Sequence, residues 1–189
     1  MSSRPVLDEG RAKAPAYGED MEALPVPVAE TPVMFGMPMP PGELLPWTWA
    51  AERLTTARTY WIATTRPDGR PHTRPVWGVW LEDGLWFSTG SVARHNLPGN
   101  PEITVHLDDG DRPVIVEGTG EAVVGVRELT RFVTAYNPKY EWDVAATEEG
   151  VEDGSGAAGP VFRVRSRLVF GWDSDLRAAT RWRFPECGK

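Results

Sequence analysis

Residues 87–97, FSTGSVARHNL, combine the residue types that bind an anion. This stretch contains three hydroxyl-bearing residues and a glycine, which are Ser88, Thr89, Ser91 and Gly90. Ser91 is a typical helix N-cap, so residues 92–97 are predicted to form a single helical turn. A strand that opens into a helix N-terminus is a common anion site, and Arg94 adds a planar guanidinium group suited to phosphate. The stretch therefore predicts an anion cradle, and a polar loop with a capping serine is the alternative.

Other common kinds of catalytic or binding motif are missing from the sequence. The three histidines, His72, His95 and His106, have no Cys or Asp partners at metal-binding spacing, so no metal site is expected. There is no Gly-x-Ser-x-Gly elbow, no phosphate loop of the nucleotide-hydrolase type and no dinucleotide glycine fingerprint.

The elements that must position residues 87–97 are predicted to be β-strands joined by tight turns. The predicted strands are 59–65, 73–81, 85–89, 102–107, 113–124 and 161–172. Gly118 and Gly120 indicate a bulge or a sharp bend within the fifth of these strands. Closely spaced antiparallel strands with bends are typical of a small barrel. We therefore expect a mainly β fold of about six antiparallel strands with a few helices.

Two helices and one loop complete this prediction. Residues 46–57 favour a short helix, and a second helix of about ten residues begins at Val126 and is expected to end at Pro138. Residues 147–159 are acidic and rich in glycine, which predicts a mobile loop. Three arginines in the last strand, at positions 163, 165 and 167, share one face and are expected to lie on a solvated edge.

The first part of the chain has a different composition. Residues 1–42 contain eight prolines, which disfavour regular structure and predict an extended or flexible arm. Residues 43–189 are expected to form the barrel domain.

Composition and charge exclude several classes of protein. A formal net charge of −7 disfavours nucleic acid and anionic lipid as partners. No stretch approaches the roughly 20 apolar residues of a membrane span, and residues 1–20 lack the apolar run of a signal peptide. The single cysteine, Cys187, cannot form an internal disulfide, so a cytoplasmic protein is expected. Nine tryptophans indicate either a core that uses large aromatic residues or, for the set as a whole, a surface covered by a flat ligand or by a partner chain.

Residues 69–107 carry a resemblance to a known family. Their order is an Asp-Gly hairpin, a strand with proline and aromatic residues, a Ser/Thr-rich strand end, a basic residue, and then Asn-Leu and Asn-Pro before the next strand. This order resembles the pyridoxamine 5'-phosphate oxidase-like superfamily of flavin- and deazaflavin-dependent oxidoreductases, which have a split β-barrel. The similarity extends over residues 58–124. Residues 134–142 and 180–184 resemble actinobacterial members of the group.

The resemblance implies an FMN-binding type of split barrel and a homodimer with two cofactor sites at its interface. The cofactor would be FMN or coenzyme F420. The residues that correspond to the family's cofactor site are Arg74, Pro75, Val76, Trp77, Ser88, Thr89, Ser91, Arg94, Asn96, Trp182 and Arg183. By this correspondence residues 75–77 would lie against the cofactor ring, and Trp182 and Arg183 would close the site.

Two departures from the family pattern affect the predicted function. Residues 78–80 stand where pyridoxamine phosphate oxidases carry a lysine, and residues 92–95 contain one arginine and a shifted histidine instead of a basic pair. True pyridoxamine phosphate oxidase activity is therefore not expected. The implied function is hydride transfer between FMN or F420 and a small organic substrate. Tyr136, Tyr140 and His72 are candidate proton donors, and no catalytic residue is assigned.

Two alternatives remain. A protein without catalysis could bind or carry a flavin or another flat ligand on the same fold, and the missing basic residues favour this alternative. An empty dimer could also serve only as a scaffold.

Overall fold

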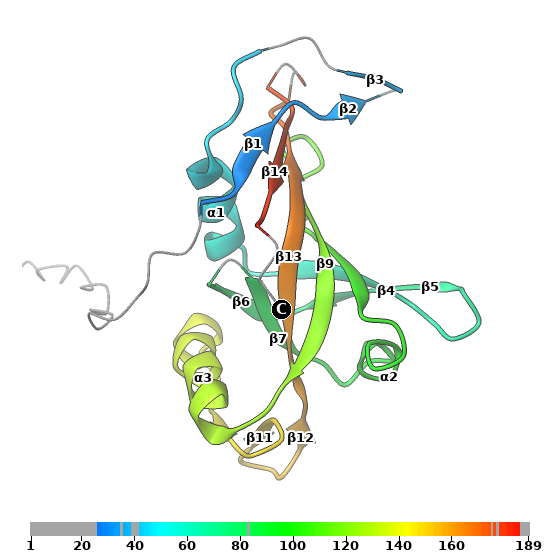
Figure 1. Ribbon diagram of the computed structural model, residues 1–189. Coiled ribbons are helices and arrows are strands. Elements are labelled where there is room, and N and C mark those ends of the chain that lie inside the picture. Colours follow the sequence, from blue (N-terminus) through cyan, green and yellow to red (C-terminus); the bar gives the residue numbers. More distant parts are fainter. Residues whose placement is uncertain are drawn as a thin grey trace, which may run out of the picture.

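A computed structural model describes residues 26–34, 36–38, 42–82, 84–174, 176 and 178–185 (Figure 1). Cys187 and most of the predicted arm lie outside these ranges. The architecture is a large antiparallel β-sheet that curves strongly, with three helices packed around it. The predicted mainly β class is confirmed. None of the helices within the described ranges is both long enough and apolar enough to cross a bilayer.

The helices are α1 (Trp47–Thr56), α2 (Ala93–Asn96) and α3 (Val126–Tyr140). The strands of the main sheet are β1 (Val28–Glu30), β4 (Tyr60–Thr65), β5 (Pro71–Val76), β6 (Gly78–Leu81), β7 (Gly84–Ser88), β8 (Glu102–His106), β9 (Val114–Val123), β13 (Val161–Gly171) and β14 (Thr180–Arg183). One small sheet pairs β2 (Val33–Met34) with β3 (Met37–Pro38), and another contains β10 (Val144–Ala146), β11 (Val151–Asp153) and β12 (Ala158–Gly159).

The long strand β13 joins the two halves of the sheet. Strands follow the order β1-β14-β13-β9-β8-β4-β5, and β7 pairs with both β13 and β6. The beginning of β13, Val161–Arg163, pairs with β7, whereas its end, Leu168–Gly171, pairs with β14. A register shift between Ser166 and Leu168 lets β13 bend while it stays paired with β9. The sheet therefore divides around β13 into a half that contains β7 and a half that contains β14.

The main core lies between the inner face of the sheet and α1. In β4 the side chains of Tyr60, Ile62 and Thr64 are buried and alternate with partly exposed residues, as a strand with one buried face requires. The core residues of α1 are Ala50 and Leu54, and the helix matches the predicted range of 46–57 closely.

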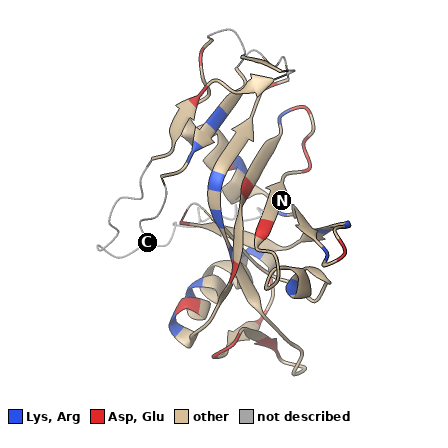
Figure 2. Ribbon diagram, turned by 45° about the vertical axis from the view of Figure 1, so that its right-hand side comes forward, with Lys and Arg blue, Asp and Glu red and all other residues tan. Residues whose placement is uncertain are grey.

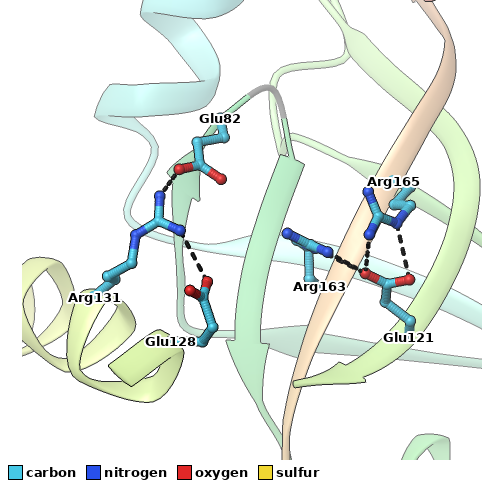
Figure 3. Close-up of polar contacts among 6 residues, drawn as sticks. All are labelled: Glu82, Glu121, Glu128, Arg131, Arg163 and Arg165. Atoms are coloured by element: carbon cyan, nitrogen blue, oxygen red, sulfur yellow. Dashed lines mark hydrogen bonds and ion pairs between the residues drawn. The ribbon is translucent and has the colours of Figure 1, made fainter. Parts of the chain in front are cut away.

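A second, smaller core lies between α3 and the half of the sheet that contains β7. Its largest side chain is Trp86, which is fully buried. The guanidinium groups of Arg131 and Arg163 lie 5.9 and 5.3 Å from the ring centroid of Trp86. Arg131 pairs with Glu82 and Glu128, and Glu121 pairs with Arg163 and Arg165 (Figure 3). These ion pairs attach α3 to the β6–β7 hairpin and connect β9 to β13.

Several expectations from the sequence are wrong in the structure, and the first concerns three arginines. The three arginines of residues 161–172 do not lie on an edge, because β13 is an interior strand. Arg163 pairs with Glu121, and Arg167 pairs with Glu102. Basic residues of β13 therefore lie next to acidic residues of the nearby strands β9 and β8 (Figure 2).

Residues 147–159 are not simply a loop. They contain β11 and β12, which pair with each other, and β11 also pairs with β10. The acidic composition indicated exposure correctly but could not show this pairing.

Pro138 does not end the second helix. It lies in the last turn of α3, where it removes one hydrogen bond of the helix, and the helix continues to Tyr140 and is capped by Glu141, which has a left-handed conformation. The side chain of Asn137 donates to the carbonyl of Val144 and accepts from its amide, which fixes this end of the helix against β10.

Regular structure also occurs where the prolines predicted none. Val28–Glu30 pairs with β14, and Pro27 and Pro32 lie outside the paired residues. The prolines therefore limit the length of this strand without preventing it.

Candidate functional site

The candidate site lies where the ladder between β6 and β7 ends. The last paired residues are Gly78 and Phe87. Residues 74–76 pair with β4 and Trp77 links them to Gly78, while residues 88–91 follow Phe87 and lead into α2. The two segments that were predicted to bind the cofactor therefore leave the β6–β7 ladder at the same end. The single predicted strand 73–81 is in fact two strands, which meet at Trp77.

A network of hydroxyl groups shapes the turn after β7. The Thr89 hydroxyl donates to Ser91 Oγ at 2.9 Å and accepts from the Ser91 amide at 3.1 Å. Ser91 Oγ accepts from the Ala93 amide at 3.3 Å, at the start of the single helical turn that was predicted. Gly90 lies between them in open space, because an added Cβ would have no atom within 4 Å. The backbone here is accessible to a ligand.

The floor of this corner is polar and buried. The Asn96 amide donates to Thr64 Oγ1 at 2.9 Å, which attaches α2 to β4. Thr64 pairs with His72 across the β4–β5 ladder. His72 is only 3% exposed. Burial, together with the charges of Arg74 and Arg66, lowers the pKa of its imidazole.

The two arginines predicted to bind the anion differ in orientation. Arg94 donates from Nε to the neighbouring His95 ring at 3.0 Å. Arg74 lies exposed on β5 and donates to the carbonyl of Thr73 at 3.1 Å. Neither has a carboxylate partner within the part of the chain that the structure describes, so the exposed guanidinium of Arg74 is available for a ligand.

Aromatic side chains form a wall next to Trp77. The Trp77 ring stacks on Tyr140 with centroids 4.8 Å apart and planes 6° apart, and it meets Trp142 edge-on at 6.0 Å. Trp77 is 39% exposed and Trp142 is 49% exposed. A flat ring with one free face is therefore held in a fixed plane at the end of the ladder.

The last turn of α3 holds this wall in place. The Tyr140 hydroxyl accepts from the Gly78 amide at 2.9 Å and lies within donating distance of the carbonyls of Gly78 and Arg58. Lys139 Nζ donates to Tyr60 Oη and to the Gly78 carbonyl, both at 3.0 Å. Burial lowers the pKa of Lys139 to about 8, with a contribution from the charge of Arg58. At the break between β5 and β6, both the amide and the carbonyl of Gly78 are therefore hydrogen-bonded to side chains of α3.

A cavity of about 250 Å³ connects the hydroxyl corner with the aromatic residues of α3. Its lining includes Ser88, Thr89, Gly90, Phe132, Tyr136 and Trp142. The Tyr136 hydroxyl has no hydrogen-bond partner among the described residues, and burial raises its pKa to about 12. Of the tyrosines considered as proton donors, Tyr136 lines the cavity, whereas the Tyr140 hydroxyl is engaged by the backbone. A larger hollow of about 530 Å³ lies over residues 147–152 and 158–160, but no predicted site residue lines it.

The structure does not bring Trp182 and Arg183 to this corner. Ser88 is opposite Val161 at one end of β13, and Trp182 is opposite Val169 near the other end. At about 3.3 Å per residue, these positions are roughly 25 Å apart along the strand. Trp182 is fully buried in the main core, and Arg183 pairs with Glu30.

Sequence reasoning missed Lys139 as part of the site. A usable signal was present, because Tyr136, Lys139 and Tyr140 are spaced by three and four residues and so share one helix face. Within the described ranges, no three His, Cys, Asp or Glu side chains cluster as metal ligands do.

Comparison with known proteins gives one family match. The sequence profile described as pyridoxamine 5'-phosphate oxidase matches residues 49–165. No curated protein matches the chain.

Several solved structures share the fold. A conserved hypothetical protein from Mycobacterium tuberculosis is 22% identical, with a TM-score of 0.60 over 80% of this chain and 96% of that one. The FAD binding protein from Mycobacterium smegmatis is 21% identical, with a TM-score of 0.52 over 75% of this chain and 99% of that one. General stress protein 26 from Bacillus anthracis is 15% identical, with a TM-score of 0.51 over 66% and 92%. At these identities, the likeness establishes the fold and no more.

Proposed function

The chain belongs to the pyridoxamine 5'-phosphate oxidase family, and on this premise we propose that it transfers a hydride between a flavin-type cofactor and a small organic substrate. The cofactor, FMN or coenzyme F420, would bind where the β6–β7 ladder ends. One observation carries the proposal: this ladder end has a hydroxyl network and an unpaired Arg74 beside a half-exposed Trp77 held in a fixed plane.

The residues present fit such a cofactor in two respects. The hydroxyls of Thr89 and Ser91, the open backbone at Gly90 and the guanidinium of Arg74 are suited to a phosphate group. The exposed face of Trp77 is suited to a flat ring. The related fold of an FAD binding protein supports a ligand of this chemical class.

When bound, the isoalloxazine or deazaflavin ring supplies the hydride chemistry, and the protein supplies binding and orientation. The stack of Trp77 on Tyr140 fixes the plane of the ring site, and the hydrogen bonds of Lys139 and Tyr140 to Gly78 keep that stack in place. The adjacent cavity of about 250 Å³ gives a small substrate a place partly shielded from water. Tyr136 keeps its proton at neutral pH and can donate a hydrogen bond to an oxygen of that substrate.

Titration with FMN and with F420 tests the cofactor part of this proposal. We expect one of them to bind, and we expect Arg74→Ala to weaken that binding by about 10- to 100-fold, because a charged hydrogen bond contributes about 1.5–3 kcal/mol. Binding is measured from the change in the ligand's visible absorbance or fluorescence. Arg70→Ala is the matched control, since Arg70 lies on the same hairpin and pairs with Asp68. If neither cofactor binds, or if Arg74→Ala binds as the unmodified protein does, the proposed site is wrong.

Turnover separates the enzyme from a carrier. The alternative of a non-catalytic flavin-binding protein uses the same corner, and the absence of the family's lysine at residues 78–80 favours it. Cofactor that binds tightly yet exchanges no hydride with a panel of conjugated carbonyl compounds and quinones would support the carrier.

We further propose that the protein is a homodimer that uses the outer face of the sheet. Strand registers align Trp61, His106, Ile115 and Phe170 in one row across β4, β8, β9 and β13. All four are half-buried and lie on the face opposite the core. Three of the four are large and apolar, and a row of partly exposed apolar side chains is typical of an interface between chains.

Analytical ultracentrifugation tests the dimer. We expect the unmodified protein to sediment as two chains and Ile115→Asp as one, because the new carboxylate would be buried without a partner. Val124→Asp is the control, since Val124 is an exposed apolar residue outside the row. A single-chain particle for the unmodified protein would contradict the proposal.

A further inference from the structure

We infer that His72 and Arg66 join Arg74 in a cationic pocket between α2 and the β4–β5 hairpin, and that this pocket selects a phosphate monoester and hence FMN over F420. The inference rests on the proposed function, because it assigns the phosphate end of the same cofactor site. It replaces the role that the sequence gave to Arg94.

The β4–β5 hairpin brings the groups of the pocket to one face. Thr64 and His72 are direct partners in the ladder. Arg74 lies two residues after His72, and Arg66 lies two residues after Thr64, so all four share the face that contains buried residues. The backbone bond from the Arg66 amide to the Arg70 carbonyl continues the ladder to the first of these arginines. Helix α2 lies against this face through the bond from Asn96 to Thr64.

Three polar atoms on this face are buried without a partner. They are Arg66 Nε, His72 Nε2 and Asn96 Oδ1, and none has a hydrogen bond to any described residue. The side chains of His72 and Asn96 are only 3% and 2% exposed. Buried polar groups in native proteins nearly always have partners, so three of them together indicate a ligand with several oxygen atoms. The Thr64 hydroxyl can donate as well as accept, which lets the Asn96 amide turn its N–H group toward such a ligand.

The charges around the pocket favour an anion. On the hairpin, Arg66 and Arg74 are close enough to His72 for their charges to disfavour its protonation. Asp68 lies at the tip of the hairpin, where its carboxylate binds Arg70. From α2, Arg94 and His95 are exposed and bind each other.

The same charges explain a preference among anions. A phosphate monoester carries about −1.5 to −2 charges at neutral pH, whereas the phosphodiester of F420 carries one. Two guanidinium groups and an imidazole that can take up a proton match the monoester more closely. A bound dianion reverses the repulsion that lowers the pKa of His72, so FMN binding is expected to draw a proton onto the imidazole.

The test compares the affinities for FMN, riboflavin and F420, measured by ligand fluorescence. We expect FMN to bind at least tenfold more tightly than riboflavin, which has the same ring without the phosphate, and more tightly than F420. His72→Gln and Arg66→Gln are each expected to reduce the FMN-to-riboflavin affinity ratio at least fivefold while riboflavin affinity stays unchanged. Arg94→Gln is the control and should keep the ratio. Lowering the pH from about 8 to about 6 removes part of the second charge of the phosphate, so the ratio should fall in His72→Gln and fall less in the unmodified protein, where His72 can take up a proton.

The outcomes separate this inference from the proposed function. If none of the three ligands binds, the proposed function fails. If FMN and riboflavin bind equally, if F420 binds more tightly than FMN, or if both Gln variants keep the ratio, the pocket is wrong while the flavin-type site stands. Should the buried His72→Gln variant fail to fold, Arg66→Gln on the hairpin still decides between these outcomes.

Discussion

Replacing Trp182 with alanine is expected to lower the free energy of unfolding by about 3–5 kcal/mol, as removal of a fully buried indole does in other cores. Trp182 is inaccessible to solvent in the main core. Its ring meets Trp47 edge-on at 5.7 Å and stacks against Trp49 at 6.3 Å, so β14 is attached to α1 mainly through this side chain.

Chemical denaturation followed by circular dichroism measures this loss. Trp77→Ala is the matched control, because Trp77 is 39% exposed and loses mainly one stacked contact, worth about 1 kcal/mol. The two variants should separate stability from ligand binding: Trp182→Ala weakens the fold, whereas Trp77→Ala weakens binding of the cofactor ring. If Trp182→Ala keeps its stability and loses only ligand binding, then Trp182 closes the site as the family resemblance implied.

Gly78→Ala is expected to lower the free energy of unfolding by about 1–3 kcal/mol and also to impair ligand binding. An added Cβ would lie 2.6 Å from the Trp86 carbonyl oxygen and 2.8 Å from a methyl carbon of Leu85. The backbone of Gly78 cannot shift freely to relieve this contact, because its amide and carbonyl are bound by Tyr140 and Lys139. Movement at this position would displace Trp77, which directly precedes it.

Thermal unfolding and cofactor titration of the same preparation measure both effects. Gly90→Ala is the control for stability, since an added Cβ there meets nothing within 4 Å, and a change below about 0.5 kcal/mol is expected. Equal stability of Gly78→Ala and the unmodified protein would show that the β6–β7 ladder tolerates a side chain at its last pair, and that the ladder end is not the rigid support described here.

The sequence predicted those features of the fold that depend on local pattern. Alternation of buried and exposed residues located β4, the Asp-Gly pair located the β4–β5 turn, and good helix formers located α1. The order of Ser, Thr, Gly and Ser after β7 also indicated the hydroxyl corner correctly as a strand end followed by one helical turn.

Features that depend on distant partners were not predictable in this way. Residues 73–81 look like one strand, and they divide at Trp77 only because β5 finds β4 and β6 finds β7. The acidic residues 147–159 form strands because β10 is available to pair with β11. Arg66 gave no local sign of importance and His72 was predicted only as a candidate proton donor, since the role proposed for both depends on α2 lying over the hairpin.

Trp182 differs, because the pattern of its own segment predicts its burial. In residues 180–183 the charged Arg181 and Arg183 alternate with Thr180 and Trp182, which is the pattern of a strand with one buried face. That pattern predicts a buried Trp182, and the structure agrees. The resemblance to a terminal family motif had suggested a ligand contact instead.

The pairing of β1 with β14 affects both the order in which the chain folds and the resistance of the folded protein to aggregation. Glu30 binds Arg181 and Arg183, and the second of these partners is 153 residues away in sequence. Closing so long a loop is entropically costly, so β1 is expected to dock late, after the barrel has formed. Once docked, it covers a strand whose free amides and carbonyls would otherwise be a template for another chain, and so it guards the folded protein against edge-to-edge aggregation.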